Sequence, residues 1–205
     1  MPISLMELSL PHNTADDGYL DRLQKTAYRK VAMKVLNSKK KGIRVQALEG
    51  KDRRWAAALL HERWGSARIV SRGQVHEADQ LLGFVAWHGD KREGLLTYRV
   101  EGLAWEIVSL DSLREGIRVG IALLGAVREM AIASGCTKLW LVTTNDNSPA
   151  IDFYQSRGFA LTAVHKDAVT KARELKPEIP MVGYGCIPIR DEFELEIRLD
   201  ALVGS

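Results

Sequence analysis

Hydrophobic residues change their spacing several times along the chain, and these changes predict alternating strands and helices. Short apolar or alternating runs predict strands, whereas spacings of three and four residues predict amphipathic helices. The expected strands span residues 43–48, 68–71, 82–88, 93–100, 103–110, 138–143, 159–164 and 193–199, and the expected helices span residues 53–64, 119–134, 149–157 and 166–175. This order indicates an α/β fold.

A strand, a polar turn, a short helix and another strand follow one another between residues 138 and 164. The run Leu139–Val142 is typical of a strand buried on both faces. The next residues favour turns and helix N-caps, because their side chains bond nearby backbone groups: Thr144, Asn145, Asp146, Asn147 and Ser148. Pro149 suits the first helical turn and Gly158 suits the C-cap. Polar groups therefore gather at the carboxyl end of a strand, where open α/β sheets bind ligands.

A second notable stretch, residues 112–124, precedes the long helix. Gly116 and Gly120 let the backbone turn tightly and leave its N–H groups open at the start of the helix. That end of a helix is electropositive and suits a phosphate or pyrophosphate. The stretch lacks the Lys-Ser/Thr pair of a P-loop and a full GxGxxG pattern, which argues against nucleotide hydrolysis and against a dinucleotide fold.

Length and composition bound the kind of protein. A chain of 205 residues suits one domain with a substantial core. It contains neither an apolar run near the ~20 residues of a membrane span nor a signal-peptide pattern. Cys136 and Cys186 are isolated, which fits ordinary thiols in a reducing cytosol, and the five histidines lack zinc-ligand spacing. We therefore expect a cytoplasmic protein without a metal site.

The basic excess of the chain lies in its N-terminal segment. Residues 1–41 hold eight Lys/Arg and four Asp/Glu, out of 29 and 26 in the whole chain. An amphipathic helix is expected from about residue 17 to 37, with an apolar stripe of Leu20, Leu23, Ala27, Val31 and Val35. We expect this helical extension, residues 1–41, to dock on the main domain, residues 42–205, or on a second subunit of a homodimer. Anchoring to nucleic acid or the ribosome is the less favoured alternative.

Together the two motifs resemble the GNAT superfamily of acyl-CoA-dependent N-acetyltransferases, over residues 43–199. Asn147-x-x-Ala150-x-x-Phe153-Tyr154-x-x-x-Gly158-Phe159 is similar to the strand–helix signature of the family, and Gly116-x-x-x-Gly120-x-x-Leu123 is similar to its pyrophosphate loop. The resemblance implies an α/β fold with a mixed, mostly antiparallel central sheet, flanking helices and two splayed parallel strands, here residues 105–110 and 138–143. It also implies acetyl-CoA as co-substrate.

The resemblance assigns cofactor-binding residues along the splayed strands and the glycine loop. These residues are Val108, Ser109, Leu110, Gly116, Ile117, Arg118, Val119, Gly120, Asn145, Asn147 and Tyr154. Asn147 is expected either to bond the cofactor arm or to cap its helix. The loop departs from the family pattern at Glu115 and Arg118. Because a carboxylate facing a pyrophosphate would be repelled, we expect Glu115 to point away and Arg118 to supply a compensating cation.

Two residues are expected to carry the chemistry of acetyl transfer to an amine. The hydroxyl of Tyr154 would protonate the departing thiolate as a general acid, the alternative being a core tyrosine. Glu106 lies in an otherwise apolar strand and would take the amine proton through water with a pKa raised by burial, the alternative being an outward-facing residue. The backbone amide of about Leu110 would polarise the thioester carbonyl.

The acceptor is expected to be a small-molecule or peptide amine, with no membrane or nucleic-acid partner. An acidic run near the C-terminus could attract a cationic amine or simply face solvent: Asp191, Glu192, Glu194 and Glu196. The long segment 166–190 is expected to help shape the acceptor site. A non-catalytic acyl-CoA-binding regulatory domain is the alternative function, and such a domain would need neither Glu106 nor Tyr154.

Overall fold

The computed structural model describes residues 42–114 and 116–199. The predicted N-terminal helical extension, Glu115 and the last residues, 200–205, lie outside this part of the chain. Within the described part, no helix combines the length and the apolar character needed to cross a bilayer.

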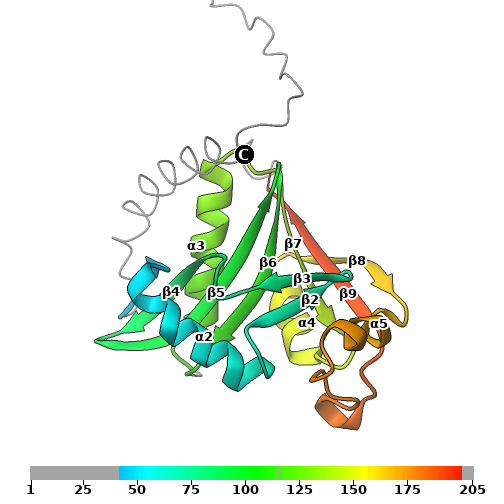
Figure 1. Cartoon of the computed structure of the whole chain (residues 1–205). Coiled ribbons are helices and arrows are strands. Elements are labelled where there is room, and N and C mark those ends of the chain that lie inside the picture. Colours follow the sequence, from blue (N-terminus) through cyan, green and yellow to red (C-terminus); the bar gives the residue numbers. More distant parts are fainter. Residues whose placement is uncertain (1–41, 115, 200–205) are drawn as a thin grey trace, which may run out of the picture.

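A seven-stranded mixed sheet forms the centre of the molecule (Figure 1). Its strands, in spatial order, are β1 (Ile43–Ala47), β4 (Leu82–His88), β5 (Lys91–Glu101), β6 (Ala104–Ser112), β7 (Lys138–Thr144), β9 (Glu192–Arg198) and β8 (Ala160–His165). Neighbouring strands run antiparallel except β6 and β7, which are parallel. The expected mixed, mostly antiparallel sheet with one parallel pair is therefore confirmed.

Helices cover both faces of the sheet. The long helix α3 (Val119–Ala133) lies on one face, where Leu123, Val127 and Met130 join the main apolar core with β1, β4 and β5. These residues recur at helical spacing, which is why the pattern predicted this helix. On the opposite face, helix α2 (Gly50–Trp64) buries residues such as Leu60 in a second core cluster (Figure 1). The sheet is therefore buried on both sides along its middle strands.

Three smaller elements surround the carboxyl ends of β6 and β7. Helix α4 (Ser148–Gln155) follows β7, and helix α5 (Ala168–Leu175) follows β8. A 3₁₀ turn, Tyr184–Cys186, lies in the connection between α5 and β9. A separate hairpin of β2 (Arg68–Ser71) and β3 (Gln74–Glu77) precedes β4. The sequence pattern predicted the first strand of this hairpin and missed the second, which is mostly exposed and polar.

The parallel pairing of β6 and β7 stops halfway along both strands. Residues 104–107 of β6 pair with residues 138–141 of β7, and the last pair is Ile107 with Leu141. Both strands continue beyond this point, to Ser112 and Thr144, and diverge in Figure 1. On its other side β6 stays paired with β5 to its end, across a register shift at Thr97/Tyr98. A gap thus opens within the sheet, bordered by a strand edge without a strand partner.

Candidate active site

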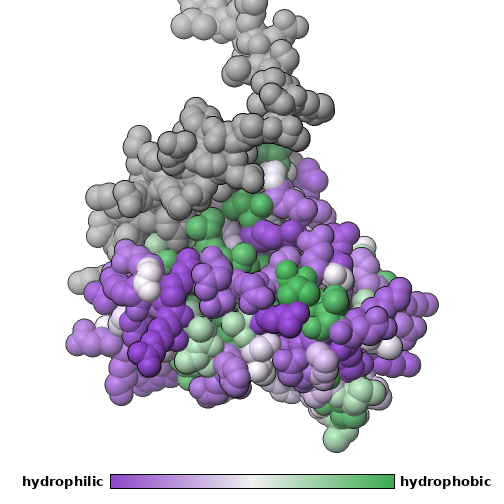
Figure 2. Space-filling view, viewed as in Figure 1, coloured by the Kyte–Doolittle hydropathy of each residue, from purple (hydrophilic) through white to green (hydrophobic). Residues whose placement is uncertain are grey.

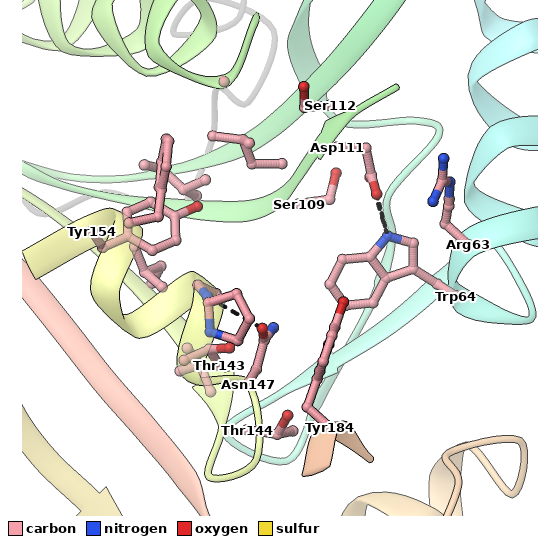
Figure 3. A pocket seen from close by; sticks show the side chains of 18 of the residues that line it. Arg63, Trp64, Ser109, Asp111, Ser112, Thr143, Thr144, Asn147, Tyr154 and Tyr184 are labelled. Atoms are coloured by element: carbon pink, nitrogen blue, oxygen red, sulfur yellow. Dashed lines mark hydrogen bonds between the residues drawn. The ribbon is translucent and has the colours of Figure 1, made fainter. Parts of the chain in front are cut away.

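A cavity of about 1130 Å³ opens where β6 and β7 diverge. Its wall is formed by the ends of these strands, the loop before α3, one face of α4, the end of α2 and the connection before β9. Figure 3 shows side chains from these elements directed into one common space. The two sequence motifs, which lie about 30 residues apart in the chain, therefore meet in a single site.

Strand β6 offers mainly its backbone to this cavity. Val108, Ser109 and Leu110 all line it. The Ser109 hydroxyl is committed to a buried hydrogen bond of 2.7 Å with the hydroxyl of Thr97 on β5. Because β7 has left the ladder here, backbone groups of β6 on that side lack a strand partner and can bind an extended chain of amides.

The loop before α3 adopts an unusual backbone. Gly116 has φ +79° and Arg118 has φ +65°, so two left-handed residues alternate with extended or helical ones. Arg118 is the N-cap of α3 but makes no side-chain cap hydrogen bond. Such alternation points successive backbone N–H groups toward one concave space, an arrangement that binds anions. An arginine in a left-handed conformation is strained, and strain of this kind concentrates at functional sites.

Gly120 allows α4 to pack closely against the start of α3. A β-carbon on Gly120 would lie 3.3 Å from the ring of Phe153 on α4. The guanidinium of Arg157 lies over the Phe153 ring, 3.8 Å from its centre. Gly120, Phe153 and Arg157 all line the cavity. The packing therefore brings the cation of Arg157, which follows α4, close to the N-terminus of α3.

The Tyr154 ring is buried, and its hydroxyl points into the cavity (Figure 3). The ring makes edge-to-face contacts with Phe153 and Phe159, at centroid distances of 5.1 and 5.3 Å. Burial, together with the negative charge of Asp111, raises the pKa of Tyr154 above its ordinary value of 10.0. The hydroxyl therefore stays protonated at neutral pH, which is the form that a general acid needs. The ring of Tyr154 therefore packs in the core, whereas its hydroxyl faces the cavity.

Asn147 caps helix α4, which is one of the two roles expected for it. Its side-chain oxygen accepts a hydrogen bond of 3.3 Å from the backbone N–H of Ala150. Asn147 also lines the cavity. Since the cap uses the oxygen, the side-chain N–H₂ group has no hydrogen-bond partner among the described residues, and a ligand carbonyl could accept from it.

Glu106 is buried, as its expected role in proton transfer requires, but it does not line the cavity. It is 1 % exposed, so it is not an outward-facing residue. One carboxylate oxygen accepts a 2.6 Å hydrogen bond from Ser71 of the β2–β3 hairpin, and the other pairs with Arg99 at 3.0 Å. His76 of the hairpin lies 3.9 Å away, too far for a hydrogen bond. The hairpin covers Glu106, which is why strand periodicity alone could not place it.

Asn145 and Ile117 also lie outside the set of residues that line the cavity. The Asn145 side chain makes three hydrogen bonds to the connection before β9. Its oxygen accepts from the backbone N–H groups of Arg190 and Asp191, and its nitrogen donates to the carbonyl of Pro188. The side chain of Ile117 packs against the main core, so only its backbone is available to the glycine loop. These hydrogen bonds give Asn145 a structural role, and its side chain is not part of the cavity wall.

The acidic run of β9 is used within the sheet and contributes nothing to the cavity wall. Glu192 is 3 % exposed and accepts a hydrogen bond from the backbone N–H of Arg72. Glu194 pairs with His165, and Glu196 pairs with Lys138, each within 3.0 Å. Because each of these carboxylates pairs with a group from another segment, these side chains do not simply face water.

Sequence reasoning missed several residues of the cavity wall: Trp64, Asp111 and Tyr184. Asp111 follows the apolar part of β6, and the indole N–H of Trp64 donates to its carboxylate at 3.1 Å (Figure 3). Burial raises the pKa of Asp111. A polar residue at the end of a strand was a usable signal for Asp111, whereas no local pattern marks Trp64 or Tyr184. No three His, Cys, Asp or Glu side chains in residues 42–114 and 116–199 gather as metal ligands would.

The comparisons with known proteins agree with this geometry. Residues 43–159 match the model of the "Acetyltransferase (GNAT) family", so the chain belongs to that family. A relative from Bacillus subtilis (strain 168), "Uncharacterized protein YdhI", is 45% identical over 130 residues, which cover 63% of this chain and 81% of the relative.

Solved structures share the fold at low sequence identity. The IAA acetyltransferase from Bacillus cereus ATCC 14579 superposes with a TM-score of 0.57 at 20% identity, covering 77% of this chain and 99% of that one. An acetyltransferase from Bacillus subtilis, solved in complex with CoA, gives a TM-score of 0.56 at 18% identity, with coverages of 77% and 99%. The resemblance noted in the sequence is thereby confirmed at the level of family and fold.

Proposed function

We propose that this protein transfers the acetyl group of acetyl-CoA to an amine acceptor. The observation that carries the proposal is the divergence of β6 and β7 beyond Ile107 and Leu141, which opens a cavity beside the glycine loop. The pantetheine arm lies along the free edge of β6 at Val108, Ser109 and Leu110. A relative of the same fold was solved with CoA, which supports this choice of donor.

The anionic part of the donor is held at the start of α3. Backbone N–H groups of residues 116–120 surround the pyrophosphate, and the helix terminus adds favourable electrostatics. Arg118 and Arg157 supply positive charge at this end of the cavity. The cationic role expected for Arg118 beside the pyrophosphate remains part of this proposal. Glu115 lies outside the described residues and has no part in the proposal.

The chemistry is direct transfer. The neutral amine attacks the thioester carbon, a C–N bond forms, and the C–S bond breaks. The leaving thiolate takes a proton from the Tyr154 hydroxyl, the amine proton leaves to water, and water returns a proton to the Tyr154 oxygen to complete the cycle. The backbone amide of about Leu110 polarises the carbonyl. Glu106 has no contact with the substrate in this scheme, since Ser71 and Arg99 occupy its carboxylate.

Calorimetric titration and a thiol-release assay test the proposal. Acetyl-CoA should bind saturably, CoA should compete for the same site, and NAD and ATP should not. With an amine present, free thiol should appear in step with acetylated amine. Lack of acetyl-CoA binding at millimolar concentration would contradict the function.

A non-catalytic acyl-CoA-binding domain is the second candidate, because the general base expected from the sequence, Glu106, lies outside the cavity wall. A carboxylate on β6 that is bound on both oxygens cannot readily take a proton from an amine in the cavity. Binding of acetyl-CoA without any thiol release across a broad amine screen would identify this alternative. The Glu106→Gln variant distinguishes a structural role of Glu106 from a role in proton transfer. If Glu106 is structural, the variant loses thermal stability but keeps the shape of the pH–rate profile.

A further inference from the structure

Asp146 is a buried carboxylate for which neither the fold nor the proposed donor site provides a full set of partners. It follows β7, is 3 % exposed and lines the cavity. Its Oδ2 atom accepts a hydrogen bond of 3.0 Å from the backbone N–H of Tyr184. Its Oδ1 atom is buried without a hydrogen-bond partner among the described residues. Leaving a buried carboxylate oxygen unpaired is costly, so a missing donor is expected at this position.

The loop before β9 packs closely against the Asp146 carboxylate. A β-carbon on Gly183 would lie 1.8 Å from Oδ2 of Asp146, so only glycine permits the contact. Gly183, Tyr184 and Ile189 belong to the same cavity wall. The three hydrogen bonds of Asn145 fix the far end of this loop. Asp146 is thus held in place by a shaped wall of the cavity, and its free oxygen has a defined position.

The surroundings favour a cationic ligand. Four arginines line the cavity, Arg63 near the end of α2, Arg114 and Arg118 before α3 and Arg157 after α4, but none forms an ion pair with Asp146 among the described residues. The rings of Trp64 and Tyr184 project into the same space (Figure 3). They are 37% and 61% exposed. Aromatic faces attract cations, and a carboxylate accepts from an ammonium more strongly than from a neutral donor.

The loop that carries Tyr184 is also apolar on its outer side. Met181, Val182 and Ile187 are exposed there, in the region where Figure 2 shows hydrophobic side chains at the lower right. Of these, Val182 also lines the cavity, together with Pro180 and Ile189, so the wall offers apolar surface for the carbon skeleton of an acceptor near the buried Asp146 carboxylate. Both features suit an alkyl amine with a charged end.

We infer that Asp146 binds a second positive charge of the acceptor, so that the substrate is an amine carrying another cationic group, as in a diamine. This inference rests on the proposed acetyl transfer. The charge at Asp146 belongs to a nitrogen other than the attacking one. A carboxylate next to the attacking nitrogen would raise the pKa of that amine and lower the fraction in the neutral, reactive form. Asp146 is therefore a specificity-determining residue.

Matched pairs of substrates test the inference. Diamines with three to six carbons are compared with monoamines of the same chain length, in the thiol-release assay with saturating acetyl-CoA. Each pair shares the attacking primary amine and differs in the second charge. For at least one length, kcat/KM of the wild-type protein should favour the diamine about 30-fold or more, as expected for a buried charge pair.

Two variants assign the preference to Asp146. In Asp146→Asn the amide oxygen can still accept from the Tyr184 N–H, so the loop keeps its anchor while the negative charge is lost. The diamine preference should fall to about one, whereas KM for acetyl-CoA and the melting temperature stay near wild type. Asp152→Asn removes an exposed carboxylate of α4 that does not line the cavity, and it should keep the full preference.

The possible outcomes separate the inference from the proposed function. A preference that survives in Asp146→Asn, or wild-type rates equal for diamine and monoamine at every length, would overturn the inference and leave acetyl transfer standing. A rise of KM for acetyl-CoA in Asp146→Asn with both amines affected equally would also overturn it, because Asp146 would then hold the pantetheine arm. Failure of the wild-type protein to bind acetyl-CoA would instead refute the function itself.

Discussion

Ile107 of β6 and Leu141 of β7 are the last residues that pair across the parallel strand junction of the sheet. Toward the N-terminal ends of the two strands the ladder is regular, and beyond the pair the strands separate around a cavity of about 1130 Å³. The chemistry proposed for the protein depends on this one transition. A strand edge that has lost its neighbour can bind an extended ligand through backbone hydrogen bonds, with little demand on side-chain identity.

Two glycines of α3 provide a matched test of the packing behind the phosphate site. Gly125 has no neighbouring heavy atom within 4 Å of an added β-carbon beyond its own helix, whereas Gly120 faces the Phe153 ring at 3.3 Å. Gly125→Ala should raise the melting temperature by about 2–4 °C, since alanine favours the helix by about 1 kcal/mol. Gly120→Ala should give no such gain and should weaken CoA binding. Scanning calorimetry and CoA titration of both variants check this, and equal gains would show that Phe153 does not constrain the loop.

Arg118 should combine backbone strain with a role in binding phosphates. Its φ of +65° costs about 1–2 kcal/mol for a residue with a side chain. Arg118→Gly and Arg118→Ala both remove the charge, but only glycine relieves the strain. We expect the glycine variant to melt higher than the alanine variant, and both to bind CoA about tenfold more weakly, in line with the loss of one charge-assisted contact.

A pantetheine fragment without phosphates is the control for Arg118. Its affinity should not change in either variant. Equal weakening of CoA and of the fragment would mean that Arg118 acts through the fold of the loop.

Much of this arrangement was predictable from the sequence because it is local. The run Leu139–Val142, the cap at Asn147 and Gly158 define a strand, a helix and its end through short-range chemistry. The glycine loop before α3 was predictable for the same reason. Membership of the acetyltransferase family followed from the combination of the two motifs.

The rest depends on contacts between distant segments. Glu106 is buried because Ser71 and Arg99 surround its carboxylate, and neither lies near it in a pattern that periodicity detects. The insertion of β9 between β7 and β8 explains why Glu194 pairs with His165 and does not face water. Asp146 belongs to the turn cluster that the sequence placed at the ligand-binding edge of the sheet, but its hydrogen bond to Tyr184 joins residues 38 positions apart and has no local signal.

Tyr154→Phe should isolate the proposed general acid. The variant keeps the ring contacts with Phe153 and Phe159 and removes one hydroxyl. The rate constant kcat should fall about 100-fold or more, while the affinity for acetyl-CoA stays near wild type. Because the pKa of Tyr154 is raised, the hydroxyl stays protonated up to its ordinary pKa of 10.0 and beyond. The wild-type rate should therefore show no loss from tyrosine ionisation between pH 8 and 10. An unchanged kcat in Tyr154→Phe would rule out Tyr154 as the general acid.

The buried His76 beside Glu106 predicts that the free energy of unfolding depends on pH. Burial lowers the pKa of His76 below its ordinary 6.5, although the charge of Glu106 opposes this and Arg99 reinforces it. The unfolded chain therefore takes up the proton at higher pH than the folded protein. The contribution of neutral His76 is fully present above pH 6.5 and is lost as the pH falls toward the lower pKa of the folded state.

His76→Gln is the variant that isolates this effect. Its melting temperature should fall less than that of the wild-type protein below pH 6.5. The comparison is needed because Glu192, whose pKa burial raises, contributes in the opposite direction as the pH falls. Parallel melting curves for the two proteins across this range would mean that His76 does not titrate differently on folding.

Amide hydrogen exchange with and without acetyl-CoA tests the central claim most directly. Peptides that cover the free edge of β6, residues 108–112, should become strongly protected when acetyl-CoA binds. Peptides that cover the paired residues 104–107 should exchange slowly in both states, because β5 and β7 already satisfy that part of the strand. Protection confined to other segments, with residues 108–112 exchanging as in the free protein, would contradict binding of the donor between the diverging strands.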